Sequence, residues 1–135
     1  MKQKEITIRR YEAEDAPHVL ALVEEEGDDW RDYWHGDARE KYQNALSSSE
    51  VYLLFTGEEC CGFIRCRDDA GYGVYVYDLL VDSKYRGNEY GRLLMERVAQ
   101  DFPNDIIYVM SDINPYYQEL GYAKVGTLFI VKGNS

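Results

Sequence analysis

A strand, a glycine-containing loop and a helix follow one another directly between residues 74 and 102, and this succession restricts the fold more than any other feature. Residues 74–81 are rich in β-branched and aromatic side chains, which favours a strand. Residues 88–102 predict a helix whose apolar side chains share one stripe: Tyr90, Leu93, Leu94, Val98 and Phe102. The apolar residues 106–110 predict another strand, so the segment forms a strand–helix–strand crossover.

The remaining segments predict strands and helices around this crossover. Residues 6–11 alternate apolar and polar side chains, which favours a strand, and residues 51–55 and 60–67 predict an antiparallel hairpin. Residues 51–55 are apolar on both faces, which indicates a central strand. Residues 122–132 are expected to supply one or two closing strands. A first helix is expected to begin at Asp15 as N-cap and to end near Gly27. A second helical region is expected over residues 30–48, with an interruption at Gly36. A short helix is expected over residues 114–120 and ends before Gly121.

These elements predict one α/β domain over residues 1–135, with a mixed, mostly antiparallel central sheet flanked by helices. The length of 135 residues and the hydrophobic content of 45% suffice for a packed core. No apolar run approaches the ~20 residues that cross a bilayer. The first residues also lack the apolar stretch of a secretory signal. We therefore expect no membrane association and a cytoplasmic location.

Charge and cysteine usage narrow the partners. The 15 Lys and Arg residues against 25 Asp and Glu residues give a net charge of −10, which argues against a nucleic-acid ligand. An acidic surface instead attracts cations, including amines. Cys60, Cys61 and Cys66 form no metal-binding pattern with the two histidines, so neither a metal site nor a disulfide framework is expected.

The loop after residues 74–81 has the properties of an anion site. The first N–H groups of a helix lack intrahelical partners, and the helix dipole adds roughly +0.5 charge at the same place. Glycines allow a close approach of the backbone to a phosphate, and Lys84, Arg86 and Arg92 lie in or beside the loop. A glycine loop between a strand and a helix also occurs without any ligand. The lack of a following Gly-Lys-Ser/Thr excludes a Walker A loop, and the Rossmann fingerprint fits poorly.

The motif Arg86-Gly87-Asn88-Glu89-Tyr90-Gly91 resembles the acyl-CoA loop of the GNAT superfamily, the Gcn5-related N-acetyltransferases, whose pattern is Gln/Arg-x-x-Gly-x-Gly/Ala. The preceding Leu79-Leu80-Val81-Asp82 and the following Arg92-Leu93-Leu94-Met95 match the context of that loop. A second block, Tyr116-Tyr117-Gln118-Glu119-Leu120-Gly121-Tyr122, is similar to the family's Phe-Tyr-x-x-x-Gly-Phe. The predicted order of strands and helices is that of the GNAT fold.

The resemblance implies acetyl-CoA as co-substrate and direct attack of an amine on the thioester, with CoA thiolate leaving. The strand of residues 79–81 would lie along the pantetheine and polarise the carbonyl through a backbone N–H. Tyr117 matches the family's tyrosine near the departing sulfur, whereas Tyr116 is expected to be a core residue. The cofactor-binding residues implied are Leu79, Leu80, Val81, Arg86, Gly87, Asn88, Glu89, Tyr90, Gly91, Arg92, Asn114 and Tyr117.

The sequence departs from the family at two places. Glu89 replaces the middle glycine of the loop; we expect its carboxylate to point outward, because the backbone makes the cradle. The glutamate that the family often places near Tyr75 or Tyr77 is missing. Simple alternation puts Tyr75, Tyr77, Leu79 and Val81 on one face and Asp78 on the other. A bulge could instead bring Asp78 into the cleft as a base; otherwise Asp78 is structural and water carries the proton.

Acceptor side chains in this family usually come from the helical region after the first strand. Here that region holds carboxylates at positions 24–26 and 28–29 beside aromatic residues, which suits an organic cation. A solvated helix end with packed tryptophans is the alternative. The substrate-binding residues expected are Trp30, Tyr33, Trp34, Tyr75 and Tyr77.

The leading hypothesis is therefore an acetyl-CoA-dependent N-acetyltransferase that acts on a primary amine of a small molecule or peptide. The alternatives are a degenerate GNAT domain that binds acyl-CoA or a protein partner without catalysis, and a structural domain that binds neither. An exposed final strand would also allow a homodimer through sheet pairing.

Overall fold

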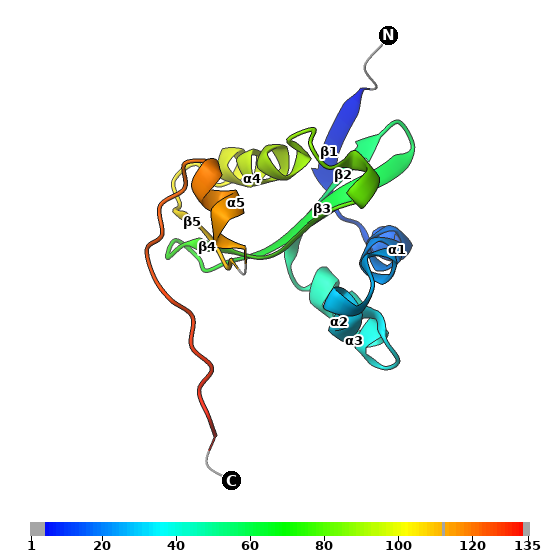
Figure 1. Cartoon of the computed structure of the whole chain (residues 1–135), viewed down its shortest axis with the longest axis horizontal. Helices are drawn as coiled ribbons and strands as arrows, with labels where there is room; N and C mark the ends of the chain where they lie inside the picture. Colours follow the sequence, from blue (N-terminus) through cyan, green and yellow to red (C-terminus); the bar gives the residue numbers. More distant parts are fainter. Residues whose placement is uncertain (1–4, 112, 134–135) are drawn as a thin grey trace.

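A single five-stranded sheet organises the chain (Figure 1). The computed structural model describes residues 5–111 and 113–133. The strands lie in the order β1-β2-β3-β4-β5: β1 (Ile6–Arg10), β2 (Glu50–Thr56), β3 (Glu59–Asp68), β4 (Val74–Val81) and β5 (Ile107–Val109). The pairs from β1 to β4 are antiparallel, and β4 and β5 are parallel. The mixed, mostly antiparallel sheet predicted from the sequence is confirmed.

Helices cover the two faces of this sheet in separate groups (Figure 1). The first group packs on one face and consists of α1 (Ala16–Glu26), α2 (Arg31–Trp34) and α3 (Ala38–Ser47). The second group packs on the opposite face and consists of α4 (Tyr90–Asp101) and α5 (Asn114–Glu119). Gly36, with φ of 57°, lies between α2 and α3, which confirms the predicted interruption. Short 3₁₀ turns occupy Ala13–Asp15, Asp28–Trp30 and Ser83–Tyr85.

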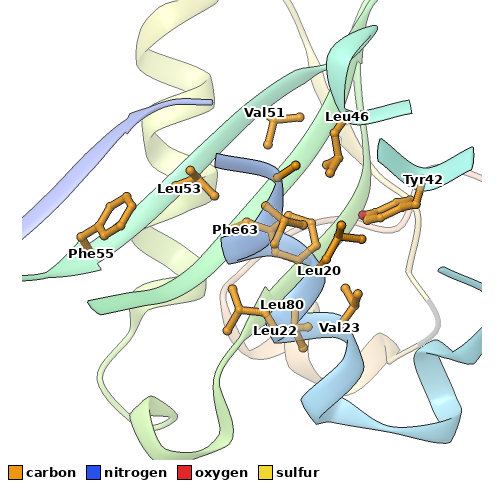
Figure 2. Close-up of a cluster of buried hydrophobic side chains, with 12 residues drawn as sticks. Leu20, Leu22, Val23, Tyr42, Leu46, Val51, Leu53, Phe55, Phe63 and Leu80 are labelled. Atoms are coloured by element: carbon orange, nitrogen blue, oxygen red, sulfur yellow. The ribbon is translucent and has the colours of Figure 1, made fainter. Parts of the chain in front are cut away.

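Helical spacing in α1 produces the core between the first helix group and the sheet. Figure 2 shows the α1 side chains gathered against β2 and β3. Val19, Leu20 and Val23 recur at intervals of one and three residues, so they share a stripe, and all three are buried. Tyr42 and Leu46 of α3 extend the same cluster.

The other face of the sheet packs against α4. Leu94, Met95 and Val98 of this helix are buried against side chains of β2, β3 and β4. In β2, Leu53 belongs to the α1-side cluster and Leu54 belongs to the α4-side cluster. The prediction that residues 51–55 form a central strand is therefore confirmed.

A bulge in β4 changes which side chains face which helices. Arg65 pairs with Asp78 and Cys66 pairs with Val76, so Tyr77 is an extra residue on β4. Val76 packs in the α4-side cluster before the bulge, and Leu80 packs in the α1-side cluster after it. The expected sharing of one face by Tyr75, Tyr77, Leu79 and Val81 is wrong, because the bulge reverses the alternation.

The bulge places Asp78 in a buried ion pair beneath the first helix group. Arg65 Nε donates to Asp78 Oδ2 at 2.5 Å, and Tyr42 Oη donates to the same oxygen at 2.8 Å. The side chains of Arg65 and Asp78 are only 14% and 4% exposed. A buried charge without a partner is costly, so each of these two groups requires the other.

Asp15 precedes α1, but its side chain does not cap that helix. Its two carboxylate oxygens accept from Arg9 Nη1 and Nη2 at 2.7 and 2.8 Å, and one of them also accepts from the backbone N–H of Glu12. The hydrogen bonds from Arg9, opposed by burial, hold the pKa of Asp15 below its usual range. The residue therefore joins β1 to the start of α1.

The closing strands predicted for residues 122–132 are wrong for the described part of the chain. Residues 120–133 contain no strand, and their course leads away from the sheet (Figure 1). Strand pairing needs a matching edge, and β5 offers an edge of only 3 residues.

The ion pair leads to a stability prediction. Arg65→Met leaves the Asp78 carboxylate buried without its cation, so we expect the free energy of unfolding to fall by about 3 kcal/mol. Arg65→Met/Asp78→Leu removes both charges and should recover most of that loss. Urea unfolding of the wild type, Arg65→Met and the double variant measures this, and a double variant less stable than Arg65→Met would contradict it.

Asp15 leads to a prediction on pH dependence. Its pKa is lower in the folded chain than in the unfolded one, so acid protonates the unfolded chain first. This contribution to stability is complete above the unfolded pKa of ~3.9 and is lost as the pH falls through the lower folded value. Asp15→Asn should therefore flatten the acid limb of stability against pH. Glu58→Gln, in the exposed β2–β3 turn, should not.

Candidate functional site

The strands β4 and β5 pair over three residues and then part. Their register runs from Val74 and Ile107 to Val76 and Val109, and the Met110 N–H donates to the Val76 carbonyl at 3.0 Å. Beyond this point β4 continues to Val81 while pairing only with β3, as far as the described residues show. Residues 77–81 therefore present an edge with unpaired backbone groups, to which an extended amide-containing ligand can add.

A tightly anchored loop leads from this edge into α4. The Asp82 N–H donates to the Cys61 carbonyl at 2.8 Å, and the buried Asp82 carboxylate accepts from the Lys84 N–H at 3.1 Å. Gly87 has φ of 88°, which glycine adopts without a steric cost. Glu89 directly precedes α4 with φ of 64°, a left-handed conformation that is strained for most residues. The glycine that the family pattern has at this position would relieve that strain.

The first turn of α4 offers free hydrogen-bond donors. Within residues 5–111 and 113–133, none of the backbone N–H groups from Gly87 to Arg92 donates to a backbone carbonyl. Leu93 is the first to do so, at 3.1 Å to the Glu89 carbonyl. Together with the helix dipole, these N–H groups are suited to receive an anion at the end of β4.

The basic side chains of this loop are all paired with carboxylates. Lys84 Nζ lies 2.9 Å from Glu59, and this hydrogen bond raises the pKa of Lys84. Arg86 Nη2 lies 2.6 Å from Glu26 of α1. Hence the local excess of positive charge that the sequence suggests is neutralised within the fold.

Arg92 is paired twice on the first turns of α4. Its guanidinium lies 2.9 Å from Glu89 and 2.5 Å from Glu96. The Glu89 side chain is 67% exposed and its carboxylate pairs with Arg92; its orientation away from a bound diphosphate stays a prediction. These contacts leave the backbone N–H groups as the donors available to a ligand without breaking an ion pair.

The helix α5 packs against the N-terminus of α4, where the side chain of Tyr116 lies directly against Gly91. A Cβ atom at Gly91 would collide with the hydroxyl oxygen of Tyr116. Tyr116 is 38% exposed, so its predicted core position is wrong. It contacts the helix terminus itself, a role that the sequence analysis missed. The clue available was the glycine at position 91 inside the first helical turn.

Tyr117 and Asn114 face a different part of the site. Both line a cavity of about 880 Å³, together with residues of β5 and of the segment after α5. Tyr117 is half-buried against the α4-side cluster and stacks on Tyr122, with ring centroids 6.4 Å apart. The structure therefore places Tyr117 next to the strand β5 that parts from β4.

The aromatic residues expected to bind an acceptor fall into two groups. Tyr33 packs on Tyr42 with centroids 4.7 Å apart, and the Arg65 guanidinium lies 5.7 Å from the Tyr42 ring and 5.4 Å from the Tyr77 ring. This places Tyr33 and Tyr77 in one contiguous cluster around the Arg65–Asp78 pair. Tyr75 lies apart from it, stacked on Tyr108 of β5 at 5.0 Å.

The two tryptophans of the acceptor region are tied to the first helix group. Trp30 lies with its ring centroid 5.3 Å from that of Tyr33 and 6.3 Å from that of Phe63, and both Trp30 and Trp34 pack on the α1-side core. Trp34 Nε1 donates to the Gly27 carbonyl at 3.1 Å. Both rings thus have packing roles, and Trp30 adjoins the Tyr33 end of the cluster around Arg65.

Metal ligation, thiol chemistry and membrane spanning are further possibilities for the part of the chain that the structure describes. No cluster of three His, Cys, Asp or Glu side chains could hold a metal ion there. Cys60, Cys61 and Cys66 are free thiols, and burial raises the pKa of Cys60 and of Cys66 to about 12. None of the helices in residues 5–111 and 113–133 has the length and apolar character needed to cross a bilayer.

Comparisons with solved structures reproduce this fold over almost the whole chain. A GNAT-family acetyltransferase from Streptococcus pneumoniae shares 26% identity and a TM-score of 0.73, covering 96% of this chain and 100% of that one. An aminoglycoside N-acetyltransferase in complex with CoA gives a TM-score of 0.74 at 13% identity, covering 99% and 98%. An aminoglycoside acetyltransferase from an uncultured soil metagenomic sample gives 0.71 at 18%, covering 96% and 97%.

Comparison with sequence families gives the same answer by an independent route. No curated protein matches the chain. A family model described as an acetyltransferase (GNAT) domain matches residues 14–135, which include the loop before α4 and the Tyr116–Tyr117 block. The chain therefore belongs to the GNAT acetyltransferase family.

Proposed function

We propose that the protein is an N-acetyltransferase that moves the acetyl group of acetyl-CoA to a primary amine of a small molecule or peptide. One observation carries the proposal: the unpaired edge of β4 leads directly to the free N–H groups of residues 87–92. CoA has an amide-containing arm and a diphosphate in the same order. A GNAT-family chain with both recognition elements intact is suited to hold it.

The residues present fit the two recognition tasks. The backbone of residues 79–81 supplies donors and acceptors for the pantetheine amides, and one N–H polarises the thioester carbonyl. The N–H groups at the start of α4 receive the diphosphate. When bound, acetyl-CoA supplies a thioester carbonyl that an amine attacks directly, with the thiolate as leaving group.

Tyr117 is the proposed catalytic residue. Its position beside β5 supports a hydrogen bond from its hydroxyl to the departing sulfur. A phenol has a pKa of ~10 and a thiol has a pKa of ~8.5, so full transfer of the proton from Tyr117 to the thiolate is unfavourable. The hydrogen bond to sulfur is therefore the main contribution of Tyr117 to catalysis. Of the two roles left open for Asp78, the ion pair with Arg65 supports the structural one. Water then carries the proton from the amine.

A cationic amine is the proposed acceptor. The net charge of −10 attracts cations. Tyr33 and Tyr77 lie in one cluster, and the exposed Asp28 and Asp32 lie in the short helical turns that carry Trp30 and Tyr33. Two of the solved relatives are aminoglycoside acetyltransferases, and aminoglycosides are polycations. Within this proposal Trp30, Tyr33, Trp34 and Tyr77 form the acceptor side and Tyr75 lies at the β5 side.

Tyr117→Phe tests the catalytic assignment. It removes only the hydroxyl, so turnover should fall by about tenfold or more, because one hydrogen bond to a charged group contributes at least about 1.5 kcal/mol. The affinity for acetyl-CoA should stay within threefold of wild type. Release of free CoA with a cationic amine gives turnover, and calorimetry gives affinity. Tyr122→Phe, in the ring that stacks on Tyr117, is the matched control. Equal turnover of wild type and Tyr117→Phe would remove Tyr117 from catalysis.

Titration with acetyl-CoA, with free CoA alongside, tests the anion site itself. The backbone makes the site and the Glu89 side chain is exposed, so Glu89→Gln should change the dissociation constant by less than about threefold. Tightening by tenfold or more would mean that the carboxylate faces the diphosphate. Lack of binding at millimolar acetyl-CoA would overturn the proposed function. Binding without thioester loss for any amine would identify the degenerate alternative.

A further inference from the structure

The cavity beside β5 is much larger than the acetyl group of acetyl-CoA. Its volume is about 880 Å³, near the upper end of the range of roughly 300–1,000 Å³ that pockets for small molecules have. An acetyl group ends in a single methyl group, so it fills only a small part of such a space. The cavity therefore has room for a longer group, provided that it opens where the acetyl group is bound.

One end of the cavity lies where the thioester is proposed to react. Met110 lines the cavity, and its N–H donates to the Val76 carbonyl at the point where β4 and β5 part. Asn114 and Tyr117 line the cavity as well, and Tyr117 is the proposed partner of the departing sulfur. An acyl group on that sulfur therefore has direct access to the cavity.

From this end the cavity follows β5 along the face that packs on α4. Ile107 and Val109 of β5 and Met95 of α4 line it, and all three belong to the α4-side cluster. Ala99, one helical turn after Met95, lines it too. These four side chains form an apolar strip without N–H or O–H groups, so they can cover methylene groups without desolvating a polar atom. The flexible side chain of Met95 suits a wall that covers chains of different length.

The apolar strip also has the length and the charge that suit an acyl chain. Ile106 and Met110 both line the cavity, and a strand advances ~3.3 Å per residue, so the lined part of β5 spans about 13 Å. A cationic amine is less suited to the strip, because Glu96, an acidic residue of the lining, already pairs with Arg92 at 2.5 Å. Size, shape and charge therefore favour a hydrocarbon chain as the occupant.

We propose that the protein also transfers medium-length acyl groups, from butyryl to octanoyl, and that the acyl chain lies in the cavity between α4 and β5. This inference rests on the proposed acyl transfer and specifies its donor as a medium-chain acyl-CoA. The amine nitrogen forms a bond to the thioester carbonyl carbon, and the C–S bond breaks with its electron pair leaving on the CoA thiolate. The proton lost by the amine passes through water to the thiolate, so the products are an amide and free CoA.

Calorimetric titration with the CoA thioesters of acetate, butyrate, hexanoate and octanoate tests the proposal, with free CoA alongside. Burial of one methylene group is worth a factor of up to about four in affinity. Hexanoyl-CoA is four methylene groups longer than acetyl-CoA, so it should bind at least about tenfold more tightly. Release of free CoA from hexanoyl-CoA, with an amine that the protein acetylates, should show that the longer group is transferred.

Ala99→Phe locates the acyl chain. Side chains of a helix lean toward its N-terminus, so a phenyl ring at position 99 extends toward Met95 and fills part of the cavity. The advantage of hexanoyl-CoA over acetyl-CoA should then fall below about threefold, while the affinity for acetyl-CoA stays within threefold of wild type. Ala99 is exposed on α4, so the variant should keep its fold and its circular dichroism.

Gln100→Phe is the matched control, because Gln100 is the next exposed residue of α4 and does not line the cavity in the described part of the chain. It should keep the full advantage of hexanoyl-CoA. Equal affinity of the wild type for all four thioesters would overturn this inference and leave the proposed function standing. An unchanged advantage in Ala99→Phe, or tight binding of hexanoyl-CoA without transfer, would also overturn it. Lack of binding of any thioester would overturn both proposals.

Discussion

The buried pair of Arg65 and Asp78 lies where the β3–β4 ladder changes register, and the arrangement of β4 depends on it. Before the bulge, Val76 packs toward α4; after it, Leu80 packs toward α1. A carboxylate at position 78 can be buried only because a guanidinium and the Tyr42 hydroxyl meet it from β3 and α3. The pair therefore fixes which side chains of β4 face each group of helices. The free edge of this strand leads into the loop.

The anion site proposed for the loop consists of backbone N–H groups. The three cations of the loop already have carboxylate partners, from the β2–β3 hairpin, from α1 and from α4 itself. The pairs of Lys84 and Arg86 attach the loop to β3 and to α1, while the N–H groups of the first helical turn remain available. A strongly acidic chain can thus retain a site for a diphosphate without presenting a basic patch, since the donors are peptide groups whose charge does not vary with pH.

Much of the fold could be predicted from residue patterns, because these patterns are local. The helical stripe of α4 and the two-sided apolar run of β2 each follow from the spacing of side chains. The sequence analysis left a bulge in residues 74–81 as one of two alternatives, and the pattern could not decide between them, because the partners of Asp78, Arg65 and Tyr42, lie at other places in the sequence. The closing strand failed for a related reason: residues 122–132 have strand composition, but pairing depends on the length of an edge elsewhere.

In the candidate site, too, local features could be predicted from the sequence and contacts between distant residues could not. The loop of residues 86–91 could be located from its glycines and its place between strand and helix. The pairing of Arg86 with Glu26 could not, because the two residues lie 60 positions apart in the sequence.

The contact between Gly91 and Tyr116 has a consequence for how such a chain can diverge. Glu89 shows that the neighbouring loop position accepts a side chain, as long as the strained backbone is tolerated. Position 91 has no such freedom while an aromatic ring occupies position 116. The two positions are therefore expected to change together in descendants of this sequence: a larger residue at 91 requires a smaller one at 116.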